Sequence, residues 1–219
     1  MNFAVILAAG KGKRFGKEKQ FVLIKNKPII FYSIQKFNKS SAIDKIIVVT
    51  TKSRIIYVNT LIKKHHFTKV TNVVVGGKER QDSMLNALRL LPDKGYVAIH
   101  DVARPLINEQ VIVQGFNCAK KHRACIPTIP ISDTVKVIQD NKVVRTIDRS
   151  QLHYVQTPQF FEIRLLKMAY AKAYKNNHYA TDDANLVERL GVKVHLIPGL
   201  KQNIKITDER DFVIVKALI

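Results

Sequence analysis

The order of apolar runs along the chain limits its fold more than any other feature. Four runs are typical of strands buried on both faces, and they span residues 2–8, 45–50, 69–77 and 96–101. Segments with helical spacing or helix-start residues follow them, at 28–39, 53–65, 81–91 and 109–121. This alternation predicts an α/β fold with helices layered on a mostly parallel sheet.

The pattern changes after Pro130. Residues 133–148 contain two β-rich arms around Asp140 and Asn141, which both tolerate left-handed turn conformations, so we expect a hairpin. An exposed hairpin is marginally stable alone and needs a partner surface, such as a second copy of the chain. We assign residues 131–153 to this arm, within one domain of residues 1–219. The layered pattern then resumes, with helices at 162–175 and after 181, a strand at 192–198 and a last helix from 208.

Length and composition exclude several classes of protein. A chain of 219 residues can bury a substantial core, and none of its apolar runs approaches the roughly 20 residues that span a bilayer. The start of the chain lacks the basic region and cleavage site of a secretory signal. Cys118 and Cys125 lack metal-ligand spacing. We therefore expect a cytoplasmic protein with no membrane partner.

The positive charge needs its own interpretation. Lys and Arg number 37 against 17 Asp and Glu, a net charge of +20 that is compatible with nucleic-acid binding. However, the lysines are scattered from end to end and form no stripe or patch interleaved with aromatic residues. We expect mostly solvated faces that attract small polyanions, and no nucleic-acid partner. A non-catalytic nucleic-acid-binding protein remains the alternative from another class.

The loop after the first strand combines glycines with positive charge. Its backbone can turn amides toward an anion, and its cations suit a polyphosphate; these residues are Gly10, Gly12, Gly16, Lys11, Lys13, Arg14, Lys17 and Lys19. The spacing G-x-G-x-x-x-G is neither the dinucleotide fingerprint nor a Walker A loop. A tight turn with solvated lysines is the structural alternative, and the density of charge favours phosphate binding.

Other unusual segments follow strands or occupy comparable loops, where parallel sheets bind ligands. Asp101 comes directly after an apolar strand, and Arg104 beside it suits a magnesium–phosphate substrate. Asp82 and Ser83 near a helix start are equally compatible with a turn and cap. Thr181 is a candidate N-cap, which does not exclude a ligand contact. No catalytic triad is apparent, and His100 occupies a position that an alternating strand would point away from the site.

Together these motifs resemble a known family. "LAAGKGKRF…KQF", "GGKERQDS", "HDVARP", "DTVK", "DR…TPQFF", "TDDA" and "NIKIT" occur in the order and at about the spacing of the 2-C-methyl-D-erythritol 4-phosphate cytidylyltransferases. The resemblance covers practically the whole chain and implies a Rossmann-like three-layer nucleotidyltransferase fold with a protruding β-hairpin arm. It also implies transfer of a cytidylyl group from CTP to 2-C-methyl-D-erythritol 4-phosphate, a polyol phosphate, with release of pyrophosphate in non-mevalonate isoprenoid synthesis. Mg²⁺ or another divalent cation would be the cofactor.

The resemblance further implies roles for single residues. The first loop would bind the CTP triphosphate, and the catalytic residues would be Arg14, Lys19, Asp101 and Lys205, with Asp101 organising the metal or the acceptor. Other nucleotide contacts would be Ala8, Ala9, Gly10, Gly12, Gly77, Asp82, Ser83 and Ala103. Acceptor contacts would be Arg104, Thr134, Arg149, Thr157 and Thr181. The arm in this family crosses a two-fold axis, so Thr134 and Arg149 would serve the partner's site in a homodimer.

The sequence also departs from the family pattern. Glu18-Lys19-Gln20 stands where Pro-Lys-Gln is usual, which frees the loop and adds a negative charge near the nucleotide. Affinity for CTP is the property that this change puts in question. A ribitol-5-phosphate cytidylyltransferase is the nearest rival; that group tends to carry "AGG" and "HDAVRP", whereas this chain has Ala8–Ala9–Gly10 and Val102–Ala103.

Overall fold

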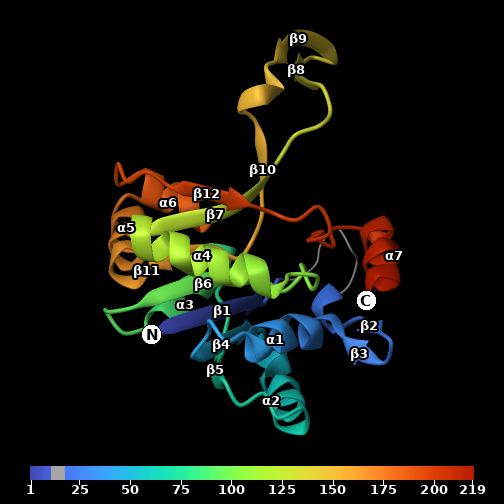
Figure 1. The fold of residues 1–219 in the computed structure, drawn as a ribbon, viewed down its shortest axis with the longest axis vertical. Coiled ribbons are helices and arrows are strands. Elements are labelled where there is room, and N and C mark those ends of the chain that lie inside the picture. Colours follow the sequence, from blue (N-terminus) through green and yellow to red (C-terminus); the bar gives the residue numbers. More distant parts are fainter. Residues whose placement is uncertain (11–17) are drawn as a thin grey trace.

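One eight-stranded sheet organises the protein, which a computed structural model describes for residues 1–10 and 18–219 (Figure 1). Its strand order is β10-β7-β11-β6-β1-β4-β5, with β12 paired to β7. The four predicted strands form the parallel part: β1 (Asn2–Ala8), β4 (Lys45–Thr50), β5 (Val70–Val75) and β6 (Tyr96–Asp101). Their carboxyl ends share one edge, where Ala8 is level with Thr50 and Leu7 with Asp101.

The rest of the sheet is mixed, and most of it was not predicted. It comprises β7 (Ala124–Pro130), β10 (His153–Val155), β11 (Gln159–Glu162) and the predicted β12 (His195–Pro198). Strand β11 runs antiparallel between β6 and β7. Prolines at 127 and 130 interrupt the strand pattern of β7, because proline cannot donate to a ladder. The four parallel strand pairs still outnumber the antiparallel ones, which confirms the mostly parallel α/β fold.

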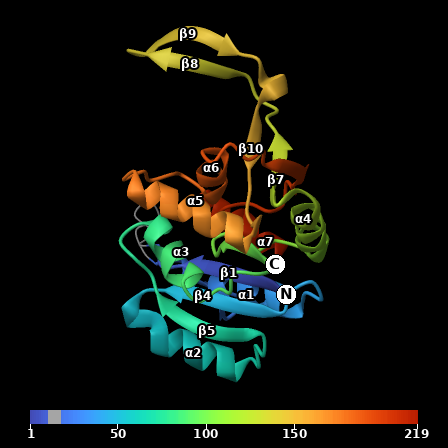
Figure 2. The same ribbon diagram turned by 90° about the vertical axis from the view of Figure 1, so that its left-hand side faces the viewer.

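Helices cover both faces of this sheet (Figures 1 and 2). One face packs against α1 (Ile29–Lys39), α2 (Ile55–Lys64) and α4 (Glu109–His122), and the other against α3 (Arg80–Leu88), α5 (Ile163–Lys175) and α6 (Asp183–Glu188). Alternate residues of β1 serve the two cores: Phe3, Val5 and Leu7 on the α3 side, Ala4, Ile6 and Ala8 on the α1 side. The chain therefore has the three predicted layers.

A smaller cluster ties the end of the chain to its beginning. Helix α7 (Glu209–Leu218) packs with the short β2–β3 hairpin (Leu23–Ile24 and Lys27–Pro28) through Ile24, Ile29, Ile206 and Val215. Two short 3₁₀ turns complete this side, η1 (Lys19–Phe21) after the first loop and η2 (Lys52–Arg54) after β4. The helix predicted to begin at residue 53 therefore begins as α2 at Ile55, because residues 52–54 form η2.

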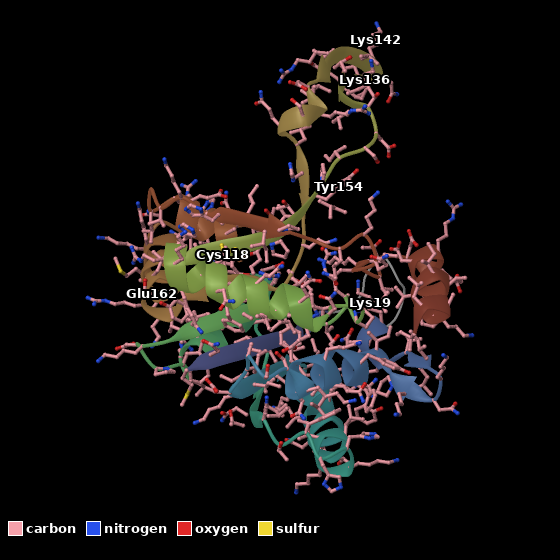
Figure 3. All side chains as sticks on the ribbon, viewed as in Figure 1. Lys19, Cys118, Lys136, Lys142, Tyr154 and Glu162 are labelled. Carbon is pink, nitrogen blue, oxygen red and sulfur yellow. The ribbon has the colours of Figure 1, made fainter. Side chains whose placement is uncertain are left out.

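The predicted hairpin consists of β8 (Val135–Gln139) and β9 (Lys142–Ile147). Asp140 and Asn141 adopt φ values of 48° and 58°, the left-handed conformations expected of such a turn. The hairpin forms a sheet of its own and stands away from the body at the end of β7 and β10, with η3 (Arg149–Gln151) at its base (Figures 1 and 2). Lys136 and Lys142 mark it in Figure 3, with Tyr154 below them on β10. No helix of the described residues is long and apolar enough to cross a membrane.

Candidate active site

Asp101 lies at the carboxyl end of β6 and contacts two cations. Its Oδ2 accepts a hydrogen bond from Nζ of Lys205 at 2.6 Å, and its Oδ1 accepts one from Nε of Arg80 at 3.2 Å. Only 14% of its side chain is exposed. Burial by itself raises the pKa of this carboxyl, but the charges of Arg80 and Lys205 outweigh it and hold the pKa well below its usual range. Asp101 is therefore ionised over the whole physiological range of pH.

Arg80, for which the sequence predicted no role, connects Asp101 to a second carboxylate. Its Nη1 donates to Oδ2 of the buried Asp183 at 2.7 Å, and the hydroxyl of the buried Tyr170 donates to Oδ1 of Asp183 at 2.6 Å. Burial lowers the pKa of Arg80, but the charges of Asp183 and Asp101 outweigh burial, so the net pKa is above its usual value. A signal existed in the sequence, because Arg80 opens a helix at the carboxyl edge of the sheet. Its partner Asp183, however, is 103 residues away.

The segment of residues 203–207 contacts both sides of the site. Its Ile206 donates from the backbone to the carbonyl of Ala103 at 2.9 Å, which docks the segment beside the end of β6. Its Lys205 contacts Asp101, and the carbonyl of Ile206 accepts a hydrogen bond from Nζ of Lys19 at 2.6 Å. Two consecutive residues thus bring Lys19 and Asp101 to one place, in the region where Figure 3 labels Lys19.

Thr157 and Arg104 hold the backbone around Asp101. The amide of Asp101 donates to Oγ1 of Thr157 at 3.0 Å, and Nδ2 of the buried Asn203 donates to the carbonyl of Thr157 at 2.9 Å. Arg104 donates from Nη1 to the carbonyl of Asn203 at 2.7 Å and from Nη2 to the carbonyl of Val155 at 3.3 Å. Arg104 therefore links the strand end, the 203–207 segment and β10 near the base of the arm.

His100 points away from Asp101, as the strand alternation predicts. Its ring is fully buried, packs against Phe37 at 4.8 Å between ring centroids, and contacts the carbonyl of Arg104 through Nε2. Burial lowers the pKa of His100 to about 3. The imidazole is consequently neutral at physiological pH and belongs to the core.

The first loop is described only at its two ends. Ala8 ends β1, and the buried side chain of Gln20 donates from Nε2 to the carbonyls of Ala8 at 3.1 Å and Gly10 at 3.0 Å. Gln20, for which the sequence predicted no role, thus holds the start of the loop against its end. Gly12 and Arg14 lie outside the described residues.

The turn before α3 is crowded around Gly76 and Gly77. A Cβ on Gly76 would lie 2.3 Å from the Cβ of Ala9, and one on Gly77 would lie 2.2 Å from the Cβ of Asp82. The amide of Gly77 donates to Oγ of Ser83 at 3.0 Å. A side chain larger than glycine therefore does not fit at either position unless Ala9 or Asp82 shifts.

Asp82 is occupied by contacts that stabilise the start of α3. It forms a capping box with Glu79, whose amide donates to Oδ2 at 2.9 Å, and Oδ1 accepts from the hydroxyl of Tyr174 at 2.5 Å. The Tyr174 hydrogen bond lowers the pKa of Asp82. These are the contacts of the cap interpretation, and a contact with cytosine stays a prediction.

Three predicted acceptor residues are exposed, and none of them hydrogen-bonds to Asp101 in the part of the chain that the structure describes. Thr134 and Arg149 are exposed on the arm, where Arg149 donates from Nη1 to the carbonyl of Ser132. Thr181 is exposed just before α6. The cap of that helix is Asp182, whose Oδ1 accepts from the amide of Asn185 at 3.1 Å, so the N-cap prediction for Thr181 was wrong by one residue.

Comparisons with known proteins agree on one family. The family model for 2-C-methyl-D-erythritol 4-phosphate cytidylyltransferase matches residues 2–219. The chain belongs to this family. A relative of that name from Dictyoglomus thermophilum is 41% identical over 98% of this chain and 95% of its own length. Another, from Lachnospira eligens, is 42% identical over 98% of this chain and 97% of its own.

A solved structure supports the same assignment at the level of the fold and family. The 4-diphosphocytidyl-2C-methyl-D-erythritol synthase from Anaerococcus prevotii superposes with a TM-score of 0.87 and 28% identity, covering 100% of this chain and 97% of that one. The resemblance stated from the motifs is thereby confirmed, as is the nucleotidyltransferase class of a 2-C-methyl-D-erythritol 4-phosphate cytidylyltransferase.

Proposed function

We propose that the protein joins CTP to 2-C-methyl-D-erythritol 4-phosphate, forming 4-diphosphocytidyl-2-C-methyl-D-erythritol and pyrophosphate in non-mevalonate isoprenoid precursor synthesis. Family membership supports the reaction. The observation that supports its location is the pair of contacts made by residues 205–206, which join Asp101 and Lys19 at the carboxyl edge of the sheet. We assign the activity to the cytoplasm.

The chemistry requires cations and orientation more than proton transfer. The phosphate of the acceptor is already an anionic nucleophile, so in-line attack on the α-phosphorus needs no strong general base. It needs positive groups that neutralise the two reactants and the developing charge. Lys19 and Lys205 would supply them together with Arg14, and Asp101 would orient Lys205. The neutral, buried His100 is consistent with this division of roles.

The site offers one carboxylate, that of Asp101, to a divalent cation. No group of three His, Cys, Asp or Glu side chains among the described residues could hold a metal ion. Mg²⁺, however, is commonly bound by one or two carboxylates together with substrate phosphates. Asp101 would be that carboxylate, and the ion would neutralise charge on the triphosphate.

The two substrates would lie on different sides of Asp101. The nucleotide would contact the first loop through Ala8, Ala9, Gly10, Gly12 and Arg14, and its base would contact Gly77, Asp82 and Ser83, with Ala103 nearby. The acceptor would contact Arg104, Thr157 and Thr181 of the same chain.

The arm would complete the acceptor site of a second subunit. Thr134 and Arg149 are exposed and would act in the partner's site across a two-fold axis. The arm and its base also expose apolar side chains that a partner would cover, namely Ile138, Val143, Val144, Tyr154 and Val155. A homodimer explains why an isolated hairpin persists so far from the body.

Pyrophosphate release tests this function. With CTP and Mg²⁺ we expect turnover of 2-C-methyl-D-erythritol 4-phosphate to exceed that of ribitol 5-phosphate, and Lys205→Ala to lower kcat by about 100-fold. Lys201→Ala is the matched control, because it removes an exposed lysine four residues earlier. Faster turnover of ribitol phosphate would favour the rival acceptor. Absence of any turnover, with salt-sensitive RNA binding in its place, would favour the nucleic-acid-binding alternative.

A further inference from the structure

Glu18, the residue that departs from the family pattern, is held by an arginine. Its Oε2 accepts a hydrogen bond from Nε of Arg54 at 2.7 Å and forms an ion pair with Nη2 of Arg54 at 2.6 Å. Its Oε1 accepts a longer one from Oγ1 of Thr51 at 3.4 Å. The negative charge that Glu18 introduces beside the nucleotide loop is therefore matched by a cation from η2.

The same arginine also contacts the other end of the short segment 18–21. The guanidinium of Arg54 lies 4.7 Å from the centroid of the Phe21 ring, and Phe21 packs edge-on against Tyr57 at 5.5 Å. The amide of Phe21 donates to the carbonyl of Glu18 at 2.9 Å, which closes the turn. Arg54 thus grips both ends of a turn whose middle residues are Lys19 and Gln20.

Those middle residues face the site. The amine of Lys19 donates to the carbonyl of Ile206, and the side-chain amide of Gln20 donates to the carbonyls of Ala8 and Gly10. Any rotation of the turn would move both contacts together, because Lys19 and Gln20 are each the immediate neighbour of a residue that Arg54 holds.

We propose that Arg54 is a positioning residue for Lys19, and that the Glu18–Arg54 pair fixes this turn in place of a proline ring. The inference rests on the proposed role of Lys19 with CTP. Glu18 has φ −68°, the angle that proline imposes, so the φ angle at this position suits either residue. The side chains of Arg54 and Glu18 are 40% and 29% exposed, so the pair is partly solvated and its effect is moderate.

The test measures KM for CTP and kcat by pyrophosphate release. We expect Arg54→Ala to raise KM for CTP about threefold to tenfold, with kcat and KM for the acceptor within about twofold of wild type. Lys52→Ala is the matched control, since it removes an exposed positive charge from the same 3₁₀ turn and should change KM for CTP less than twofold. Glu18→Pro should keep KM near wild type, whereas Glu18→Gln should raise it.

The outcomes separate this inference from the proposed function. If the wild-type protein does not turn over CTP, the proposed function fails. If wild type is active and Arg54→Ala behaves like Lys52→Ala, the positioning role of Arg54 is wrong. If Arg54→Ala lowers kcat, raises KM for both substrates and lowers the melting temperature, the variant is destabilised as a whole. That result would also overturn the positioning role. Glu18→Pro raising KM as much as Glu18→Gln would overturn the equivalence of ion pair and proline.

Discussion

The cluster around Asp101 and the hairpin arm represent two ways of presenting charged groups to a ligand. Asp101 is largely buried, and its side chain and amide contact residues from α3, the 203–207 segment and the loop before β11. Arg149 is exposed and contacts a carbonyl of its own arm. Asp101 is fixed by the body of the chain, whereas Arg149 lies on a hairpin that stands away from the body.

The difference follows from the cost of burying charge. A carboxylate out of water is stable only when cations and donors surround it, so Asp101 and Asp183 each require Arg80. An arginine in solvent needs no such partner and can meet a ligand that arrives with a second subunit. In the proposed homodimer, folding positions the groups around Asp101, and association would add those of the arm.

Replacing Asp101 should produce the largest effect. Asp101→Asn keeps the shape of the side chain but removes the charge that orients Lys205, so we expect kcat to fall by about 100-fold or more. Pyrophosphate release measures the rate, and thermal melting shows whether the fold persists. A loss smaller than threefold in a folded variant would show that the buried half of the site is not the catalytic one.

Mixing two variants tests the division between body and arm. Arg149→Ala alone should lower turnover about 10-fold to 100-fold, because a charge-assisted contact to the acceptor is lost. In a heterodimer of Asp101→Asn and Arg149→Ala, purified through two different tags, crossed arms leave one of the two sites intact. We expect about half of the wild-type activity.

Homodimers of each variant, treated identically, provide the controls for this mixture. If the heterodimer is no more active than these parents, Asp101 and Arg149 act within one chain. That result would contradict the exchange of arms.

The sequence was sufficient to predict what local patterns determine. Continuous apolar runs predicted β1, β4, β5 and β6, and a carboxylate directly after a buried strand predicted where Asp101 would lie. The pair Asp140–Asn141 predicted the hairpin turn because few other residues accept its backbone angles.

Contacts between distant segments could not be predicted in this way. Arg80 and Asp183 meet only because β11 enters the sheet antiparallel beside β6 and carries α5 and α6 to the α3 side. No periodicity in either segment specifies that arrangement. The cap of α6 was misassigned from Asp182 to Thr181 because both residue types are good caps and local sequence does not separate neighbours.

The smallest expected effect is a loss of stability in acid, caused by His100 in the core beside Asp101. The pKa of His100 is lowered by burial to about 3, below the unfolded value of about 6.5. Between these values the unfolded chain binds a proton that the folded chain does not. The contribution of His100 to stability should therefore be constant above pH 6.5 and become less favourable as the pH decreases.

The slope of this decline is at most about 1.4 kcal/mol per pH unit. Urea denaturation at pH 7.0, 6.0 and 5.2 measures it, and this window lies above the pKa of about 3.9 that Asp101 has in the unfolded chain. In His100→Asn, which cannot take up that proton, the decline should be shallower by this amount. Equal slopes in the two proteins would show that His100 is hydrated or protonated in the folded state. The core beside Asp101 would then be open to water and would differ less from the exposed arm.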